Sequence, residues 1–305
     1  MEFLYFLEKI RIPVLNELML AITTLGEETA FLVIALVLFW CVDKYVGYYT
    51  LSVGFVGTIL SQFMKLCFRI PRPWVLDENF SAMEQAIPKA TGYSFPSGHT
   101  QSAVGTLGSV AYTTKYKTVR IVSVVLAALV AFSRMYLGVH TPLDVGVGIL
   151  LSVALVFALR PVVLKNRQNR MPWLLAAMIL LGIGYLCYLM FWPFPDAVKA
   201  EENYLHGLEN AYTLLGALAG MVIVYIVDEK WLNFNTKAVW WAQILKVVLG
   251  LGLVLIVKSG TKGLLNMCFG EYAGRAIRYA LIVAVAGILW PLTFRWFSRL
   301  GRKGM

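Results

Sequence analysis

The sequence predicts an all-α, polytopic membrane helix bundle with about nine spans and an additional N-terminal interfacial helix. Two observations predict this fold class. Of the 305 residues, 59% are hydrophobic and 14% are charged, and the mean hydropathy is +0.70. Soluble domains are about 45–50% apolar and about 25% charged. The apolar residues also form stretches close to the roughly 20 residues that cross a bilayer. Soluble globular, disordered and fibrous classes are therefore excluded.

The N-terminal segment differs from the stretches that follow it. In residues 1–25, charged side chains interrupt Phe, Leu and Ile at roughly helical spacing, which is typical of a helix lying at the membrane interface. The later stretches hold Gly, Ser and Thr among Leu, Val and Ala, as packed membrane helices do. The predicted spans are 27–42, 45–67, 98–113, 119–133, 141–160, 172–192, 208–228, 238–258 and 278–297.

Charge in the connections predicts the orientation. Lys and Arg gather in 113–120, in 160–170 and at the C-terminal end, and such residues favour cytoplasmic loops. The segments 68–97 and 134–140 then face the outside. The same bias explains the net charge of +10, so we expect no nucleic-acid partner.

A break in composition at 160–171 divides the chain. Polar residues cluster at the outer ends of spans before this break and are sparse in the spans after it. We therefore predict a core over 1–168, made of the interfacial helix and five spans. An additional C-terminal membrane domain of about four spans would cover 169–305, and the sequence gives it no role.

Two polar clusters lie at predicted span ends in the first half of the chain. The first, KLCFRIPRP, puts Lys65 in the last turn of a span, and two prolines hold Arg72 in an extended segment. The second, YSFPSGHT, has the pattern of a helix start: Ser97 is the expected N-cap, and Gly98 lets the backbone approach a ligand before His99. Amides at a helix start can bind an anion.

A third cluster, SRMYLGVHTPLD, lies on the same predicted side of the membrane. Arg134 ends one span and His140 opens the next. Asp144 follows four residues later, so on a helix the two side chains share a face and can hydrogen-bond. The alternative is that Asp144 only caps the helix.

The three clusters together predict metal-free phosphoryl chemistry. Lys65, Arg72 and Arg134 supply three cations, and the two guanidinium forks match phosphate oxygens. His99 and His140 come from different helices and can serve as nucleophile or base and as acid; which one attacks is left open by the residues alone. No third histidine, cysteine pair or carboxylate cluster lies nearby to complete a metal site. We expect no cofactor.

The four cysteines support the same conclusion. They are widely spaced, and none forms a Cys-x-x-Cys pair. We interpret them as small core residues and not as a zinc site or a disulfide framework. They are Cys41, Cys67, Cys187 and Cys268.

These clusters resemble the three signature motifs of the type 2 phosphatidic acid phosphatase superfamily, which also contains glucose-6-phosphatases and vanadium haloperoxidases. Its first motif, Lys, six residues and Arg-Pro, matches Lys65 and Arg72-Pro73. The second, Pro-Ser-Gly-His, matches 96–99. The third, Ser-Arg, five residues, His, three residues and Asp, matches the cluster from Ser133 to Asp144. Order and spacing agree, and the resemblance covers about 25–160.

The resemblance implies a role for each matched residue. His140 would attack phosphorus and form a phosphohistidine, and Asp144 would hold it in the attacking tautomer. His99 would protonate the leaving alkoxide and then activate water. No divalent metal would be needed. The phosphoryl oxygens would be bound by Lys65, Arg72, Arg134, Ser97 and Gly98.

The expected function is thus an integral-membrane lipid phosphate or diphosphate phosphatase whose active site faces outside. Undecaprenyl diphosphate, phosphatidic acid and phosphatidylglycerol phosphate are the candidate substrates. Short outer loops favour a bacterial plasma membrane. Two alternatives stay open: a phosphatase of a soluble sugar phosphate, and a catalytically silent protein that binds or transports lipid. The sequence leaves the oligomeric state open.

Overall fold

A computed structural model of the chain describes residues 1–165 and 167–300, and all regular secondary structure in these ranges is helical. The chain forms two compact units. Unit 1 comprises Met1–Ile34, Tyr49–Lys165 and Pro193–Gly207; unit 2 comprises the remaining segments, 35–48, 166–192 and 208–305. Three helices have residues in both units: α3 (Glu28–Val37), α4 (Lys44–Phe68) and α11 (Glu202–Val227).

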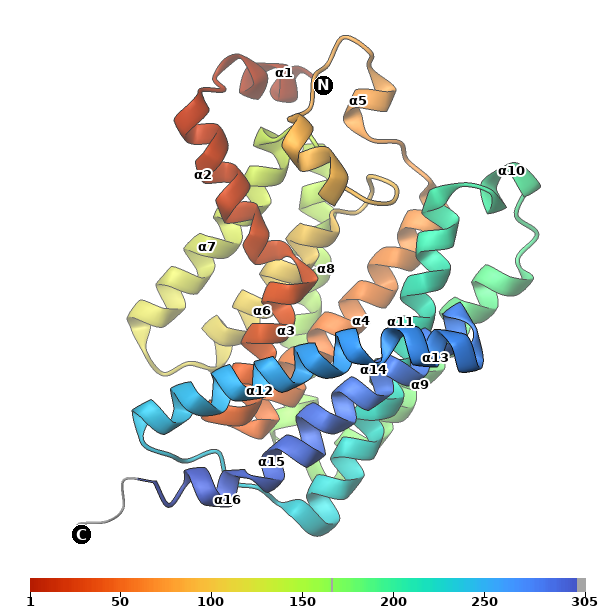
Figure 1. Cartoon of the computed structure of the whole chain (residues 1–305). Coiled ribbons are helices and arrows are strands. Elements are labelled where there is room, and N and C mark those ends of the chain that lie inside the picture. The colour runs from red at the N-terminus through yellow and green to blue at the C-terminus, as the bar shows by residue number, and fades with distance from the viewer. Residues whose placement is uncertain (166, 301–305) are drawn as a thin grey trace. The chain divides into compact units, whose positions relative to one another are not determined.

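Unit 1 contains the three polar clusters (Figure 1). Its other helices are α1 (Glu2–Lys9), α2 (Pro13–Thr23), α5 (Pro73–Leu76), α6 (Gly98–Thr113), α7 (Lys117–Tyr136), α8 (Pro142–Arg160) and α10 (Asp196–Lys199). Short helical turns lie at Thr24–Gly26, Glu84–Lys89 and Pro161–Lys165.

Helix α6 is the centre of unit 1. It packs against both α7 and α8, and nine of its 16 residues are buried. Small side chains permit this packing. A Cβ added at Gly148 in α8 would lie 3.0 Å from the Ser97 carbonyl oxygen, so glycine lets α8 approach the start of α6.

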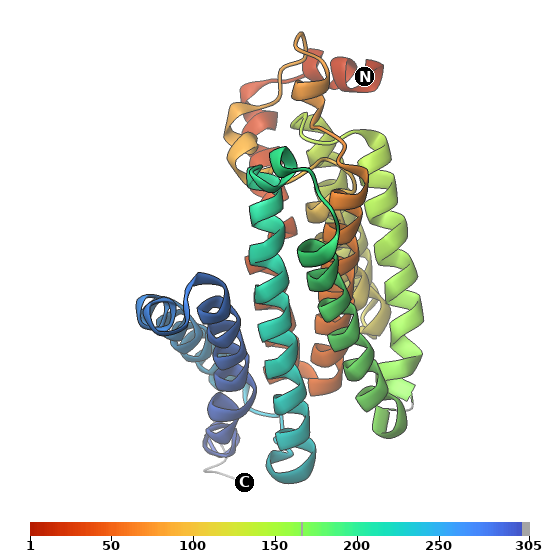
Figure 2. The same ribbon diagram turned by 90° about the vertical axis from the view of Figure 1, so that its right-hand side faces the viewer.

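The loops that carry the clusters gather at one end of unit 1. Helix α1, helix α5, the α7–α8 turn and α10 lie at the same end in both views (Figures 1 and 2). Hydrogen bonds fix the long 69–97 segment there: the Met83 amide donates to the Leu137 carbonyl at 2.9 Å, and the Ser94 amide donates to the Ile70 carbonyl at 2.8 Å. The fold therefore brings the clusters together as the sequence predicts.

Unit 2 contains the helices of the C-terminal part of the chain. They are α9 (Arg167–Phe191), most of α11, α12 (Trp240–Gly260), α13 (Lys262–Phe269), α14 (Glu271–Ala284), α15 (Trp290–Leu292) and α16 (Phe294–Phe297). The π-helical turns Leu38–Val42, Asp228–Leu232 and Val285–Leu289 extend helices of this unit. Helix α14 packs against both α12 and α13.

The prediction of a polytopic membrane bundle is confirmed, but the count of nine spans is not. In the described residues, seven helical segments are long and apolar enough to cross a membrane. An eighth results if the bent pair Pro13–Gly26 and Glu28–Val42, inclined by 56°, is one span. Helix α6 has only 16 residues, which is about 24 Å and shorter than the roughly 30 Å hydrocarbon core. The 27–42 stretch is one arm of the bent pair, and the other arm belongs to the segment predicted to be interfacial.

The interpretation of the cysteines as core residues is wrong for three of the four. Cys67, Cys187 and Cys268 are exposed, and Cys41 is half-buried. The physical reason is that the surface of a membrane helix is itself apolar, so an apolar sequence context does not separate core positions from lipid-facing ones.

Candidate active site

Lys65 and Arg72 reach the site from the end of α4 and from the segment that follows it. Lys65 lies in the last turn of α4, and its ammonium donates to the Tyr93 carbonyl. Arg72 is the N-cap residue of α5 in an extended conformation, with φ −71° and ψ 156°. Both side chains are buried. The proline-flanked geometry predicted from the sequence is therefore confirmed.

The guanidinium of Arg72 connects three parts of the site. Its Nε and Nη2 donate to the carbonyls of Gly92 and Thr91 at 3.0 and 2.7 Å. Its Nη1 donates to the Val139 carbonyl at 2.9 Å and lies 2.8 Å from Nε2 of His140. Four of the five N–H donors of an arginine are used in this way.

Asp144 lies beside His140, although the two residues do not share a helix face. Helix α8 begins at Pro142 with Thr141 as its N-cap, so His140 precedes the helix. Its Nδ1 still lies 3.5 Å from Oδ2 of Asp144. Asp144 also completes a capping box with Thr141. Asp144 therefore caps α8 and also lies beside His140, so it does not only cap the helix.

The start of α6 has the predicted cap. Ser97 is the N-cap residue, and its hydroxyl oxygen accepts from the Thr100 amide at 3.4 Å. The Ser97 amide donates to the Asp144 carbonyl at 3.0 Å. The amides with no acceptor inside the helix are therefore those of Gly98 and His99. No atom would lie within 4 Å of a Cβ added at Gly98, so this backbone borders open space.

Arg134 and His99 carry buried nitrogens that are unpartnered within the described part of the chain. Arg134 lies in the last turn of α7 and is fully buried. Its Nη1 donates to the Thr23 hydroxyl at 2.7 Å, but its Nε and Nη2 have no partner, and neither has Nε2 of His99. Buried polar groups normally have partners. Such a set of donors fits an anionic ligand.

The electrostatics of His140 fit this geometry. Burial holds the pKa of His140 well below its ordinary value, and the charges of Arg72, Arg134 and Lys65 lower the pKa further. The imidazole is therefore neutral at neutral pH. If the proton of the neutral ring is on Nδ1, which faces Asp144, the lone pair is on Nε2 and is available to a nucleophile.

Two models of one protein family match the chain. The first, the PAP2 superfamily, matches residues 44–168, and the second, the transmembrane extension of PAP2 superfamily phosphatases, matches residues 212–303. The chain belongs to the PAP2 superfamily. It is an integral membrane protein and a phosphoric ester hydrolase of this superfamily.

Curated relatives carry phosphatase names. The chain is 35% identical over 144 residues to an undecaprenyl-diphosphatase of Sulfolobus acidocaldarius, a match that covers 46% of this chain and 67% of the relative. It is 30% identical over 164 residues to phosphatidylglycerophosphatase B of Bacillus subtilis, which covers 50% of this chain and 76% of the relative. No solved structure matches the chain.

Several site residues were not identified from the sequence. Ser94 donates its hydroxyl to Oδ2 of Asp144 at 2.6 Å, and Thr23 holds Arg134. Tyr93 supplies the carbonyl that accepts from Lys65. Ser94 lies two residues before the second motif and could have been considered. Thr23 is 111 positions from its partner, and no local signal identifies it.

Proposed function

We propose that the PAP2 superfamily site of this chain hydrolyses a lipid phosphate through a phosphohistidine on His140, at the outer face of the membrane. One observation carries the proposal: the unpartnered nitrogens of Arg134 and His99 are buried beside a neutral His140. A phosphate dianion would satisfy the arginine donors. The substrates to test are undecaprenyl diphosphate, phosphatidic acid and phosphatidylglycerol phosphate.

In the first step, Nε2 of His140 would form a bond to phosphorus while the bond from phosphorus to the leaving oxygen breaks. Burial and then the charges of Arg134, Arg72 and Lys65 hold the pKa of His99 well below its ordinary value. The bound substrate phosphate would offset these charges, and the protonated His99 would then donate a proton to the leaving oxygen. Asp144 would stabilise the positive charge that develops on the imidazole of His140. The contact between Arg72 and Nε2 of His140 would have to open first, because the attacking lone pair must face phosphorus.

In the second step, water would attack the phosphohistidine and release inorganic phosphate. His99, now unprotonated, would take the proton from this water, and the bond between phosphorus and His140 would break. Arg134, Lys65 and the Gly98 and His99 amides would stabilise the charged oxygens in both steps. Ser97 would act through the cap that places these amides.

Phosphate release by the purified full-length chain in detergent with EDTA tests this proposal. The panel holds the three lipids and glucose 6-phosphate, with His140→Ala assayed beside the wild type. We expect release from at least one lipid and a loss of more than about 10³-fold in the variant. No release from any lipid by folded protein would favour the silent lipid-binding alternative, and release from glucose 6-phosphate alone would favour the soluble substrate.

A second experiment tests whether the active site faces the outside of the bacterial plasma membrane, as proposed. In a background without native cysteines, Ser81→Cys places a thiol at an exposed position of the 69–97 segment. Lys115→Cys places one in the α6–α7 connection, at a comparably exposed position. An impermeant thiol reagent applied to intact cells should label the first variant and not the second. The reverse pattern would contradict the orientation.

A further inference from the structure

A cavity of about 560 Å³ opens beside the active site of unit 1. Arg72 belongs to its lining, and the same guanidinium lies 2.8 Å from Nε2 of His140. Arg72 therefore contacts both the cavity and His140. The part of a substrate attached directly to the reacting phosphate would reach this space.

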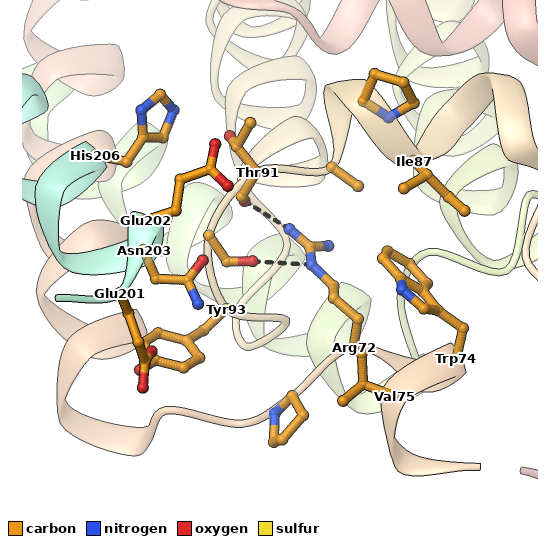
Figure 3. Close-up of a pocket in the computed structure, with 14 residues that line it drawn as sticks. Arg72, Trp74, Val75, Ile87, Thr91, Tyr93, Glu201, Glu202, Asn203 and His206 are labelled. Carbon is orange, nitrogen blue, oxygen red and sulfur yellow. Dashed lines mark hydrogen bonds between the residues drawn. The ribbon is translucent and has the colours of Figure 1, made fainter. Parts of the chain in front are cut away.

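The cavity has two chemically different walls, which Figure 3 shows on either side of Arg72. One wall is apolar and is formed by Trp74, Val75 and Ile87 with Pro88. The opposite wall is polar and comes from the start of α11 and the residue before it. Its members are Glu201, Glu202, Asn203 and His206. This wall lies outside both family-model matches, 44–168 and 212–303.

Tyr93 ties the polar wall to the catalytic centre. Its hydroxyl donates to a carboxylate oxygen of Glu201, while its carbonyl accepts from Lys65. One residue therefore fixes both the phosphate-binding lysine and the segment that begins α11. The polar wall is therefore held in a fixed position relative to Lys65.

We propose that this cavity is the subsite for the leaving group and that Glu201 and Glu202 make it select phosphomonoesters over diphosphates. This inference rests on the proposed function. Carboxylates accept hydrogen bonds from hydroxyl or ammonium groups and repel a second phosphate. Arg72 offsets one of the two negative charges and is largely engaged by backbone carbonyls and His140. The chemistry of the wall thus fits an uncharged or donor-bearing leaving group.

Farnesyl monophosphate and farnesyl diphosphate test the proposal, because they differ only in the second phosphate. We expect the wild type to have a higher kcat/KM for the monophosphate. Glu202→Gln and Glu201→Gln should each reduce this preference by about threefold to tenfold, a modest change because both carboxylates are partly exposed to solvent. The double variant should reduce it further.

Asp196→Asn is the matched control. It removes one negative charge from the same connecting segment, but its side chain is fully exposed and does not line the cavity. The preference of this variant should stay within about twofold of the wild type. A wild-type preference for the diphosphate, or glutamine variants that remain active with an unchanged preference, would overturn the subsite. No phosphate release from either probe would instead overturn the proposed function.

Discussion

Each unit of the molecule has a fully buried cation, Lys246 in unit 2 and Arg134 in unit 1, and the two differ in how their nitrogens are satisfied. In unit 2, Lys246 is fully buried, and its ammonium donates to the carbonyls of Trp40 and Thr236 at 3.1 and 3.0 Å. It also lies 4.3 Å from the centre of the Phe294 ring. In unit 1, Arg134 is equally buried, yet its Nε and Nη2 have no partner in the described residues.

This difference suggests how a buried cation with a structural role can be distinguished from one that binds a ligand. Cations inside a membrane domain are expensive and therefore suggest function by default. Lys246 shows why that default is too broad, because backbone carbonyls and an aromatic face satisfy its charge within unit 2. Lys44 is similar: it pairs with Asp228 at 2.8 Å and with the side chain of Asn233 at 3.0 Å. Several unsatisfied donors beside a histidine are the better indicator of a ligand site, because a single buried Nε without a hydrogen-bond partner in the described residues also occurs at Arg278 of unit 2.

Replacing each of the two buried cations, Arg134 and Lys246, by methionine tests the difference between them with the largest expected effect. Arg134→Met should lower kcat/KM by about 10²–10³-fold, because it removes donors to the transition state. Its thermal stability in detergent should change little, since the lost bond to Thr23 is offset by the removal of a buried charge. Phosphate-release kinetics and the unfolding midpoint would be measured on the same preparations.

Lys246→Met should show the opposite pattern. The Trp40 carbonyl loses the ammonium donor, and the Thr236 carbonyl keeps only the side-chain amide of Gln243 as a side-chain donor. This loss should destabilise the fold by about 1–3 kcal/mol. The kcat/KM of the protein that stays folded should remain within about twofold of the wild type. If Lys246→Met abolished catalysis without loss of stability, the distinction between the two regions would be wrong.

Arg72 offers a second comparison, because it touches His140 directly. Burial and then the charge of Arg72 keep the pKa of His140 low, so neutral His140 persists as the pH falls. The acid limb of kcat/KM should lie below the ordinary histidine pKa of about 6.5. Arg72→Met removes a cation, raises the pKa of His140 and should move this limb to higher pH.

Arg72→Lys serves as the control for charge. Lysine keeps the positive charge but cannot reproduce the several hydrogen bonds of the guanidinium, so kcat/KM should fall. The pH at which kcat/KM declines on the acid side should stay near that of the wild type. Substrate ionisation is common to all three proteins and cancels in the comparison. An acid limb that did not move in Arg72→Met would show that Arg72 does not control the protonation of His140.

The smallest expected effect concerns Ser94. Ser94→Ala removes the 2.6 Å hydrogen bond to Asp144 and should lower kcat by about threefold to tenfold with little change in KM. Ser109→Ala is the matched control, since its buried hydroxyl donates to the Gly105 carbonyl within α6. Equal losses of kcat in both variants would show that packing, and not the position of Asp144, is responsible.

Much of this architecture could be predicted because motif spacing acts locally. Lys65 at the end of α4, Ser97 at the start of α6 and Arg134 at the end of α7 follow from caps, prolines and hydropathy. The number of spans could not be predicted in this way. Hydropathy does not distinguish a short buried helix such as α6 from a span, and it does not reveal the bend before α3.

The remaining site residues depend on long-range folding. Thr23 accepts a hydrogen bond from Arg134, and Glu201 accepts one from Tyr93, which is 108 positions away in the chain. No local sequence pattern indicates either contact. The predicted boundary at 168/169 remains a prediction, as do the catalytic roles of the site residues. The pairing of His140 with Asp144 was expected from helical spacing, but it arises from the capping box before and within the first turn of α8.

Trapping the phosphorylated enzyme is the most direct test of the proposed chemistry. Wild-type protein would be mixed with saturating lipid substrate, quenched in alkaline detergent after milliseconds and digested for mass spectrometry. We expect a phosphate that is stable in alkali and labile in acid on the peptide that contains His140, and none in Asp144→Asn at the same time point. Phosphate on the His99 peptide, or turnover without any phosphorylated peptide, would contradict the assignment of His140 as the nucleophile.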